Sequence, residues 1–350
     1  MKTLLIMLAL GTAVNAAAQD DTALLGRLTR TPLHYVVQRT DVPPRIDGTL
    51  GDLAWQHTPW TGFFTDIEGD IRPAPLYHTR VKMLWDEHYL YIGAELEEPQ
   101  IWGNVAHHDE VVFHDNDFEV FVNPDNNAKH YFEIEINALA TIFDLFLPEP
   151  YRYGGSALVS WDAVGLKKAV HINGTLNHAG DTDQGWTVEL AIPLAAISMG
   201  NGTEVPKPGS LWRINFSRVE WDTEIQDGRY VKRTDPATGR PLPEHNWVWS
   251  PQGVIDMHLP ERWGYLLFAG DTTDAFALPP VEALKNRLWE VFYREQMYRH
   301  AHDAYTDAAT LGVADPSLSI EATPHTFKAF LTGEGQTWSI DPRGNIQREK

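Results

Sequence analysis

Short runs of alternating apolar and polar residues fill the sequence from about residue 33 to residue 268, and Gly, Pro, Asn and Asp separate them. A period of two residues places the apolar side chains on one face of a strand, and the breakers between runs favour turns. We therefore predict an all-β fold, a two-sheet antiparallel β-sandwich of jelly-roll-like architecture. The predicted strands are YVVQR (35–39), TRVKMLW (79–85), YLYIGAEL (89–96), DFEVFV (117–122), YFEIEIN (131–137), LKKAVHI (166–172), WTVELAI (186–192), LWRINFSRVEW (211–221) and YLLFAG (265–270).

Turns and short helices connect these strands. WDEH at 85–88 lies between two of them and predicts a tight hairpin turn. GTLGDLAWQH around 50–57 predicts one helical turn. IPLAAI at 192–197 predicts a second short helix, because Pro193 suits a first helical position.

The C-terminal residues 279–350 differ from this middle region. Apolar residues recur near helical spacing from Leu284 to Tyr298, and Gly312 is expected to end the helix. Two further runs, within 326–346, predict strands of a small β extension. A segment of about 70 residues holds little core of its own, so we expect it to be an appendage of a sandwich that spans residues 19–278.

The N-terminus is typical of a cleavable secretion signal. Residues 1–18 contain one Lys, an apolar run from Leu4 to Leu10, and small residues at Ala16 and Ala18. The apolar run is too short to span a bilayer. We therefore expect an exported protein, periplasmic or extracellular, without membrane insertion.

Composition excludes several classes of function. The chain has no cysteine, which rules out a disulfide framework, zinc-thiolate sites and a cysteine nucleophile. It has 48 acidic against 28 basic residues and a formal charge of -20. Phosphate binding draws on clustered Lys and Arg, so nucleic acid and anionic membranes are disfavoured as partners. Neutral sugars and divalent cations are compatible with this charge.

An acidic hairpin is the most unusual local pattern. In HDNDFEVFVNPDNNAKHYFEIEINA (114–138), the period of two residues and one turn predict that Glu119 faces Glu135 and that Asp117 faces Asn137. Glu133 shares this face of the hairpin. Carboxylates directly opposite each other destabilise a sheet unless something separates or neutralises them.

Three kinds of neutralisation remain open. The face could meet water, or it could meet the guanidinium of Arg213 or Arg218 from the strand at 211–221. It could also hold a hard cation such as calcium, which takes carboxylate and carbonyl oxygens. The residues expected to provide that calcium site are Asp115, Asp117 and Asp125.

Several motifs, taken in order and spacing, resemble the family 9 carbohydrate-binding modules and their wider relatives. They cover roughly residues 35–270. The motifs are IDGTLGDLAW (46–55), TRVKMLWDEHYLYIGAEL (79–96), HDNDFEVFVNP (114–124), WDAVGLKKAVHINGT (161–175), GWTVELAIP (185–193), WRINFSRVE (212–220) and LPERWGYLLF (259–268).

This resemblance implies a β-sandwich that binds saccharides, bound calcium in some members, and association with secreted glycoside hydrolases. Members that hold a sugar do so between two tryptophans, and the matching positions here are Phe113 and Met257. The acid of the first strand matches Glu119. The basic residue of the return strand falls near Glu133 or Glu135, so the known sugar-binding arrangement is altered.

We therefore predict a secreted, non-catalytic carbohydrate-binding protein that serves polysaccharide or oligosaccharide breakdown. Sugar rings stack on aromatic side chains and their hydroxyls need polar partners. Trp247 and Trp249, in a loop rich in turn residues, are added as stacking partners. The predicted ligand-binding residues are Phe113, Glu119, Glu133, Glu135, Asn137, Trp247, Trp249 and Met257.

Other functions remain as alternatives. Glu119 with Glu135 or Asp117 would serve a hydrolase acting on O-glycosyl bonds. A sandwich without sugar binding would serve as an interaction module. A haem site would draw on Met83, Met257, His114 and His258. The histidines before the acidic strand are compatible with a further metal site, a polar rim around a ligand, or no role; they are His107, His108 and His114.

Overall fold

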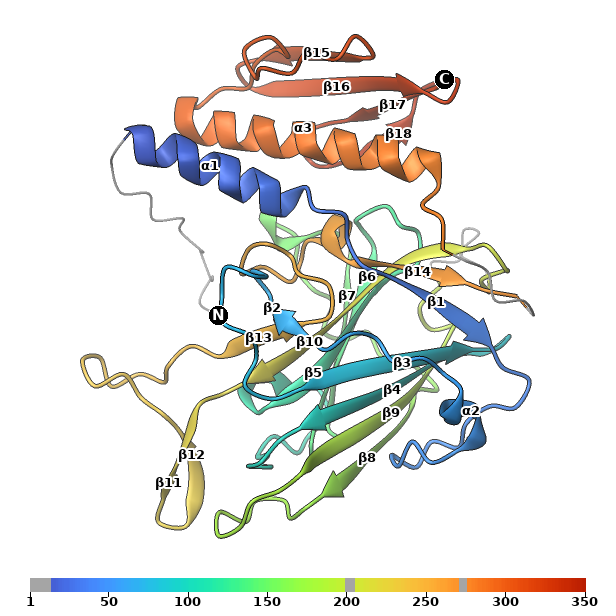
Figure 1. The fold of residues 1–350 in the computed structure, drawn as a ribbon, viewed down its shortest axis with the longest axis vertical. Helices are drawn as coiled ribbons and strands as arrows, with labels where there is room; N and C mark the ends of the chain where they lie inside the picture. Colours follow the sequence, from blue (N-terminus) through green and yellow to red (C-terminus); the bar gives the residue numbers. More distant parts are fainter. Residues whose placement is uncertain (1–13, 199–204, 271–275) are drawn as a thin grey trace. The chain divides into compact units, whose positions relative to one another are not determined.

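The computed structural model describes residues 14–198, 205–270 and 276–350 (Figure 1). It divides into two compact units. Residues Thr31–Pro279 form the first, and the described residues up to Arg30 form the second together with Pro280–Lys350. Residues 1–13 of the predicted signal peptide lie outside the described residues, and 14–18 begin helix α1 (Val14–Leu28). Among the described residues, no helix is both long and apolar enough to cross a bilayer.

A 12-stranded sheet forms the frame of the first unit. Its main order is β7-β6-β5-β10-β14-β1-β3-β4-β9-β8, and β13 and β2 extend from β10. Neighbours are antiparallel except at β1, which is parallel to both β14 and β3. The strands are β1 (His34–Arg39), β2 (Thr65–Asp66), β3 (Thr79–Trp85), β4 (Tyr89–Glu97), β5 (Asp117–Asn123), β6 (Tyr131–Asn137), β7 (Ile142–Leu147), β8 (Lys167–Asn173), β9 (Gly185–Pro193), β10 (Leu211–Glu220), β13 (His245–Val248) and β14 (Gly264–Phe268).

This sheet turns back on itself along β1 and forms two layers (Figure 1). Phe118 and Val120 of β5 belong to one buried cluster with Val81 and Met83 of β3. Because β5 and β3 lie in different layers, this cluster is the core of a sandwich. The predicted two-sheet β-sandwich is confirmed.

The nine predicted strands all occur in the structure, and so does the hairpin at 85–88. Trp85 pairs with Leu90 across that turn, and the N–H of Asp86 donates to the carbonyl of Tyr89 at 3.0 Å. The helix predicted at 192–197 is wrong. Strand β9 continues to Pro193, and the N–H of Ala196 then donates to the carbonyl of Pro193 in a turn. Helix α2 (Leu53–Gln56) supplies the helical turn expected near residue 50.

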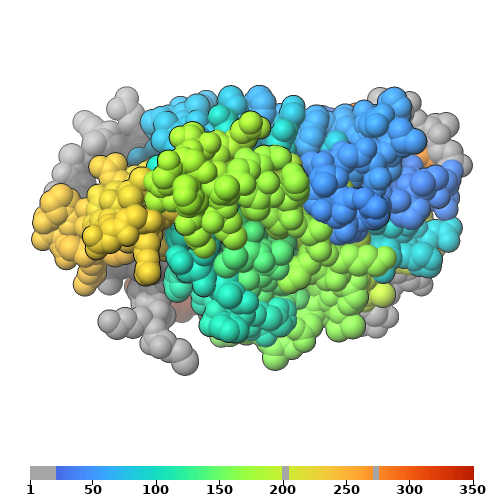
Figure 2. Space-filling view, turned by 90° about the horizontal axis from the view of Figure 1, so that it is seen from below, coloured from blue at the N-terminus to red at the C-terminus, as the bar shows by residue number. Residues whose placement is uncertain are grey.

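A separate hairpin, β11 (Thr223–Gln226) and β12 (Arg229–Lys232), projects from the sandwich. Figure 2 shows this hairpin in yellow at the edge of the molecule, beside the yellow-green segment that follows β8. The Tyr230 hydroxyl joins the two by donating to the carbonyl of His178 at 3.2 Å.

The second unit contains α1, the long helix α3 (Pro280–His302) and a four-stranded antiparallel sheet. Helix α3 ends at His302 instead of at Gly312. Asp303 adopts a left-handed φ of 54° and its N–H donates to the carbonyl of Arg299, which closes the helix. The strands are β15 (Leu318–Thr323), β16 (Thr326–Gly333), β17 (Gln336–Ile340) and β18 (Ile346–Arg348).

Candidate functional site

The acidic hairpin has the predicted register. Glu119 pairs with Glu135 and Asp117 pairs with Asn137 across β5 and β6. Phe118 and Val120 point into the core between the layers, as predicted. The other face of this hairpin carries the acids, and we call it the acid face. It comprises Asp117, Glu119, Phe121, Tyr131, Glu133, Glu135 and Asn137.

The acid face is covered, so the alternative of water on an open face does not hold. Phe121 and Tyr131 belong to a second apolar cluster with Trp263 and Met257, which come from the chain between β13 and β14. Glu119 is 5% exposed, and its acidic neighbours are at least as deeply buried. Apolar side chains from residues distant in sequence thus cover this face.

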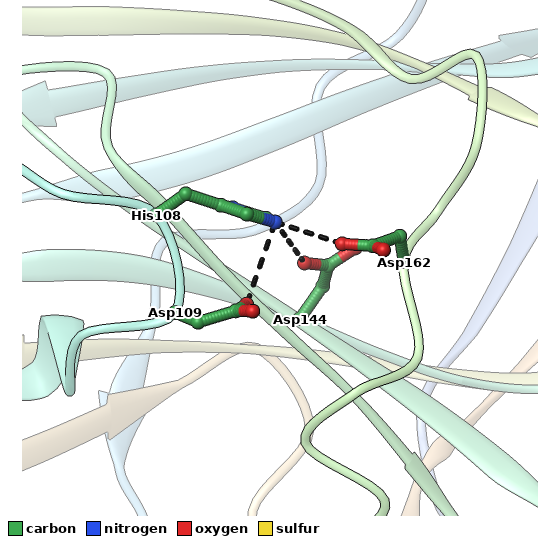
Figure 3. Close-up of side chains that lie close together, drawn as sticks. All are labelled: His108, Asp109, Asp144 and Asp162. Carbon is green, nitrogen blue, oxygen red and sulfur yellow. Dashed lines mark hydrogen bonds and ion pairs between the residues drawn. The ribbon is translucent and has the colours of Figure 1, made fainter.

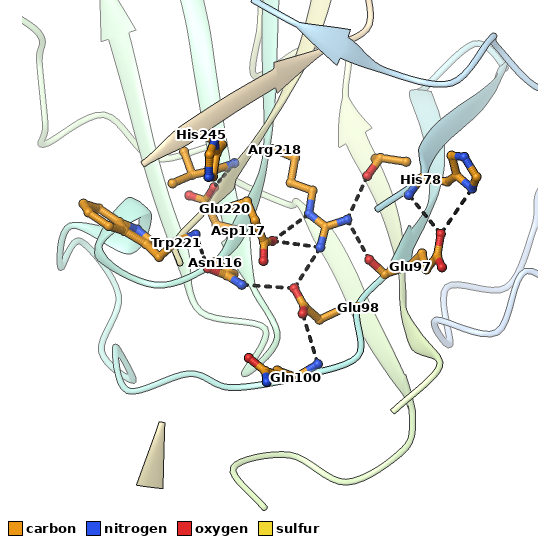
Figure 4. A network of polar contacts seen from close by, with 12 residues as sticks. His78, Glu97, Glu98, Gln100, Asn116, Asp117, Arg218, Glu220, Trp221 and His245 are labelled. Atoms are coloured by element: carbon orange, nitrogen blue, oxygen red, sulfur yellow. Dashed lines mark hydrogen bonds and ion pairs between the residues drawn. The ribbon is translucent and has the colours of Figure 1, made fainter. Parts of the chain in front are cut away.

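The two arginines considered as partners of the acids bind other groups. Arg218 pairs with Phe118 in the sheet, so the strand period places its side chain on the opposite face. Its guanidinium there binds Glu98 and Glu220, each at 2.8 Å, in a fully buried network (Figure 4). Arg213 pairs with Asn123 at the far end of β5 and donates to the Trp263 carbonyl and the Tyr265 hydroxyl.

Burial therefore dominates the ionisation of the acid face. Desolvation raises the pKa of Glu119 to about 7. It raises the pKa of Asp117, Glu133 and Glu135 well above their ordinary values, and the charge of Glu119 raises each of them further. Two polar atoms on this face, Asp117 Oδ2 and Glu133 Oε2, have no hydrogen-bond partner among the described residues. The face thus keeps protons that exposed carboxyls would lose at neutral pH.

The residues predicted to bind calcium do not come together. Asp117 begins the seven-residue strand β5 and Asp125 lies beyond its other end, and a strand rises about 3.3 Å per residue. Asp115 accepts hydrogen bonds from the N–H groups of Asn104 and Val105, both at 2.8 Å, and so anchors a loop. A different set is close enough to share an ion: ligand oxygens of three buried acids lie within 4.8 Å of one another. These acids are Asp117, Glu119 and Glu135.

Asn137 also has a structural role. Its amide Nδ2 donates to the Val105 carbonyl at 2.8 Å and to Asp115 at 3.0 Å, and its Oδ1 accepts from the N–H groups of Leu139 and Thr141. Because these bonds use both ends of the amide, the prediction of Asn137 as a ligand-binding residue does not fit the structure.

Two exposed aromatic rings border the acids. Phe113, 37% exposed, lies in the short helix η1 (Val112–His114), and its N–H donates to Glu135 Oε2 at 3.1 Å. Tyr151, 44% exposed, lies near Glu133 and Glu135, whose charges add to the burial that raises its pKa to about 12. We call Phe113 and Tyr151 the aromatic rim. Phe113 was predicted from the sequence but Tyr151 was missed, although YRY at 151–153 places aromatic residues in a loop.

His258 joins this region from the chain before β14. Its ring lies 4.5 Å from that of Tyr151, and its Nδ1 lies 3.0 Å from the Tyr131 hydroxyl. Burial lowers the pKa of His258 to about 4, so this ring is neutral at physiological pH. It is a polar group beside the aromatic rim that was not among the predicted ligand-binding residues.

The two tryptophans predicted as stacking partners are in the core. The expected loop is strand β13, and Trp247 pairs with Arg218 on the face directed between the layers, with 3% exposure. Trp249 is equally buried, and its ring fills the space over Gly264, where an added Cβ would meet it at 2.4 Å. Their exposure was wrongly predicted, because cross-strand pairing with β10 turned the segment inward.

The remaining predicted positions are also buried. Met257 lies in the second apolar cluster, where the Trp263 indole N–H donates to its carbonyl at 2.8 Å. Met83 lies in the core on the opposite face of the sheet from Met257 and His258. The residues of the haem alternative are therefore divided by a sheet and do not form one site.

A two-layer sandwich with carboxyls and aromatic rings at one sheet face has the architecture of a carbohydrate-binding module. The family model described as carbohydrate family 9 binding domain-like matches residues 46–241, more than half of the chain. The chain belongs to this family.

The chain is also similar to parts of two larger enzymes. It is 28% identical to Exoglucanase XynX of Acetivibrio thermocellus over 160 residues, which are 46% of this chain. The identity and the matched length are the same for Endo-1,4-beta-xylanase A of Thermoanaerobacterium saccharolyticum. The match covers only 12% of either relative. A family 9 module from Caldicellulosiruptor kristjanssonii, solved with cellotriose, is 15% identical with a TM-score of 0.42, over 70% of this chain and 99% of that one.

Proposed function

We propose that this chain is an exported, non-catalytic protein that binds a saccharide between Phe113 and Tyr151, above the acid face. Carboxyl groups accept hydrogen bonds from sugar hydroxyls, and aromatic rings stack on the C–H faces of sugar rings. Membership of a carbohydrate-binding family supports the ligand class. The two similar enzymes degrade glycans by name, which supports a role in polysaccharide or oligosaccharide breakdown beside secreted glycoside hydrolases.

One observation carries this proposal. Four carboxyls lie buried on one strand pair, and within the described residues no Lys, Arg or His forms an ion pair with any of them. Buried carboxyls without a cation destabilise a fold, and such costs persist chiefly where a function requires them. Asp117 Oδ2 and Glu133 Oε2 lack donors, and sugar hydroxyls would supply them once the apolar side chains over this face move aside.

The aromatic rim lies at the border of the acids. Phe113 precedes β5 and Tyr151 follows β7, and each lies close to Glu135. The Trp221 indole N–H donates to the Phe113 carbonyl at 2.9 Å and so anchors the backbone of this rim residue.

Calorimetric titration of the full chain tests this proposal. We would titrate glucose, xylose, cellotriose and xylotriose into wild-type protein and into Glu119→Gln, which keeps the size of the side chain. Hydrogen bonds to charged groups contribute about 1.5–3 kcal/mol. At pH 8, where Glu119 with a pKa of about 7 is mostly ionised, Glu119→Gln is therefore expected to weaken binding by roughly 10-fold or more. Glu87→Gln is the matched control, because Glu87 forms an exposed ion pair with Arg39.

The same titrations separate the rival functions. Calcium is proposed as an alternative occupant of Asp117, Glu119 and Glu135, so each titration is repeated with calcium and with EDTA. Release of reducing sugar that Glu119→Gln abolishes would identify a hydrolase. Absence of heat with every saccharide, in either condition, would refute carbohydrate binding and favour an interaction module.

A further inference from the structure

A second cluster of ligand groups lies away from the acid face, at the edge of the large sheet. Figure 3 shows the side chains of Asp109, Asp144 and Asp162 converging on the ring of His108. His108 Nε2 lies 2.8 Å from Asp162 Oδ1, 3.4 Å from Asp109 Oδ1 and 3.8 Å from Asp144 Oδ1. The four residues come from three separate stretches of chain.

The spacing of these atoms suits one metal ion. One ligand atom from each residue lies within 4.8 Å of the others. Nitrogen and oxygen ligands bind zinc tetrahedrally at about 2.0–2.2 Å, so ligand atoms on a shared ion lie roughly 3.4 Å apart. His108, Asp109 and Asp162 are exposed and can close the remaining difference by rotating their side chains.

Asp144 points a buried, unsatisfied oxygen into this cluster. It lies on β7 and is 2% exposed. Its Oδ2 accepts a hydrogen bond from the N–H of Ala163 at 2.6 Å, which fixes the carboxyl group. Its Oδ1 has no hydrogen-bond partner among the described residues, and it faces His108 Nε2 beyond hydrogen-bonding distance. A buried carboxylate oxygen without a donor destabilises a fold unless a cation binds it.

His108 is held in the orientation that a metal ligand requires. Its Nδ1 lies 3.1 Å from the carbonyl of Ile142, which can only accept a hydrogen bond. Nδ1 therefore carries a hydrogen. Without a metal, Nε2 also donates to Asp162 Oδ1 at 2.8 Å, and a bound metal ion would displace that Nε2 proton and take the lone pair. Metal-binding histidines generally have this arrangement, in which a carbonyl or carboxylate fixes the other ring nitrogen.

We propose that His108, Asp109, Asp144 and Asp162 bind one divalent transition-metal ion, zinc or manganese. Three carboxylates and a neutral imidazole together carry three negative charges, which a divalent cation largely offsets. The imidazole nitrogen selects a transition metal, because calcium and magnesium prefer oxygen ligands. This site is distinct from the calcium alternative on the acid face, and it does not depend on saccharide binding.

The ion would fasten three segments at the end of the sheet. Strand β7 is the terminal strand of the order, and beyond it only an isolated bridge from Phe146 to Leu158 is formed among the described residues. The ion joins β7 to the loop that carries His108 and Asp109 and to the segment that carries Asp162. That loop leads directly into η1, so the metal would also steady the chain beside the aromatic rim.

The test is direct metal binding by the full chain. Metal-free protein is titrated calorimetrically with Zn²⁺, Mn²⁺, Ca²⁺ and Mg²⁺, and its Tm is measured with each. We expect one Zn²⁺ per chain at this site, bound at least 10-fold more tightly than Ca²⁺, with a raised Tm. Asp144→Asn should remove this binding without lowering the Tm of the metal-free protein, because the amide can still accept from Ala163 and carries no buried charge.

Two further variants guard against adventitious binding and misfolding. His108→Ala changes an exposed residue and should also abolish the site. His178→Ala is the matched control, because His178 pairs with Asp181 at 3.2 Å without belonging to such a cluster. Co²⁺ would add a visible absorption band that His108→Ala removes and His178→Ala keeps. If Asp144→Asn and His108→Ala bind Zn²⁺ as the wild type does, or if the wild type binds none, the proposal is wrong.

Discussion

Replacing Glu119 by Gln should stabilise the sandwich at alkaline pH while it weakens saccharide binding. The side chain keeps its size, and the paired acid Glu135 loses a charged neighbour. Burial holds the pKa of Glu119 at about 7, above its ordinary 4.5. Because the folded state binds this proton more tightly than the unfolded chain does, the group stabilises the fold fully below pH 4.5. That contribution is lost as the pH rises to about 7.

The magnitude follows from this difference in pKa. At 1.36 kcal/mol for each pKa unit, ionising the buried carboxyl at pH 8 costs about 3 kcal/mol relative to the unfolded chain. The amide of the Glu119→Gln variant would carry no charge at any pH, so the variant avoids this cost. For a unit of this size, a gain of that order raises the Tm by roughly 5–10 °C.

Differential scanning calorimetry at pH 5 and pH 8 would measure the effect in wild type, Glu119→Gln and Glu87→Gln. The expected gain of Glu119→Gln is large at pH 8 and small at pH 5, where wild-type Glu119 is mostly protonated. Glu87→Gln should change the Tm little at either pH, because exposed ion pairs contribute about 0–1 kcal/mol. If the Tm gain of Glu119→Gln at pH 8 does not exceed its gain at pH 5, the ionised Glu119 carboxyl does not destabilise the fold. That result would refute the reasoning.

Three other substitutions probe the buried ion network, the aromatic rim and the core packing. Arg218→Met leaves the buried Glu98 without its cation and should lower the free energy of unfolding by about 3–5 kcal/mol, measured by urea denaturation. Tyr151→Ala should weaken saccharide binding in calorimetry while the Tm is unchanged, whereas Tyr151→Phe keeps the ring and should retain most of the affinity. Gly264→Ala places a Cβ 2.4 Å from the Trp249 ring and should lower the Tm; an unchanged Tm would show that this packing yields easily.

Local patterns predicted much of the fold because they depend on neighbours in sequence. The alternation in DFEVFV and YFEIEIN fixed which side chains share a face, and the single turn between them set Glu119 opposite Glu135. IPLAAI at 192–197 was misjudged, because pairing with β4 continued the strand through Pro193. The inward turn of Trp247 on β13 was also missed, since strand pairing across a long separation has no local signal.

The sequence by itself determined the strand pattern, the register of the acidic hairpin, the acidic charge and the family resemblance. Three features were decided only by the tertiary structure. The acid face is covered, Arg218 forms an ion pair with Glu98 on the opposite face of the sheet, and Asp144 lies beside His108 at the sheet edge. The physical reason is the range of the interactions involved. Side-chain alternation is set by the backbone of one strand, whereas burial and charge pairing depend on segments brought together only when the whole sheet has closed.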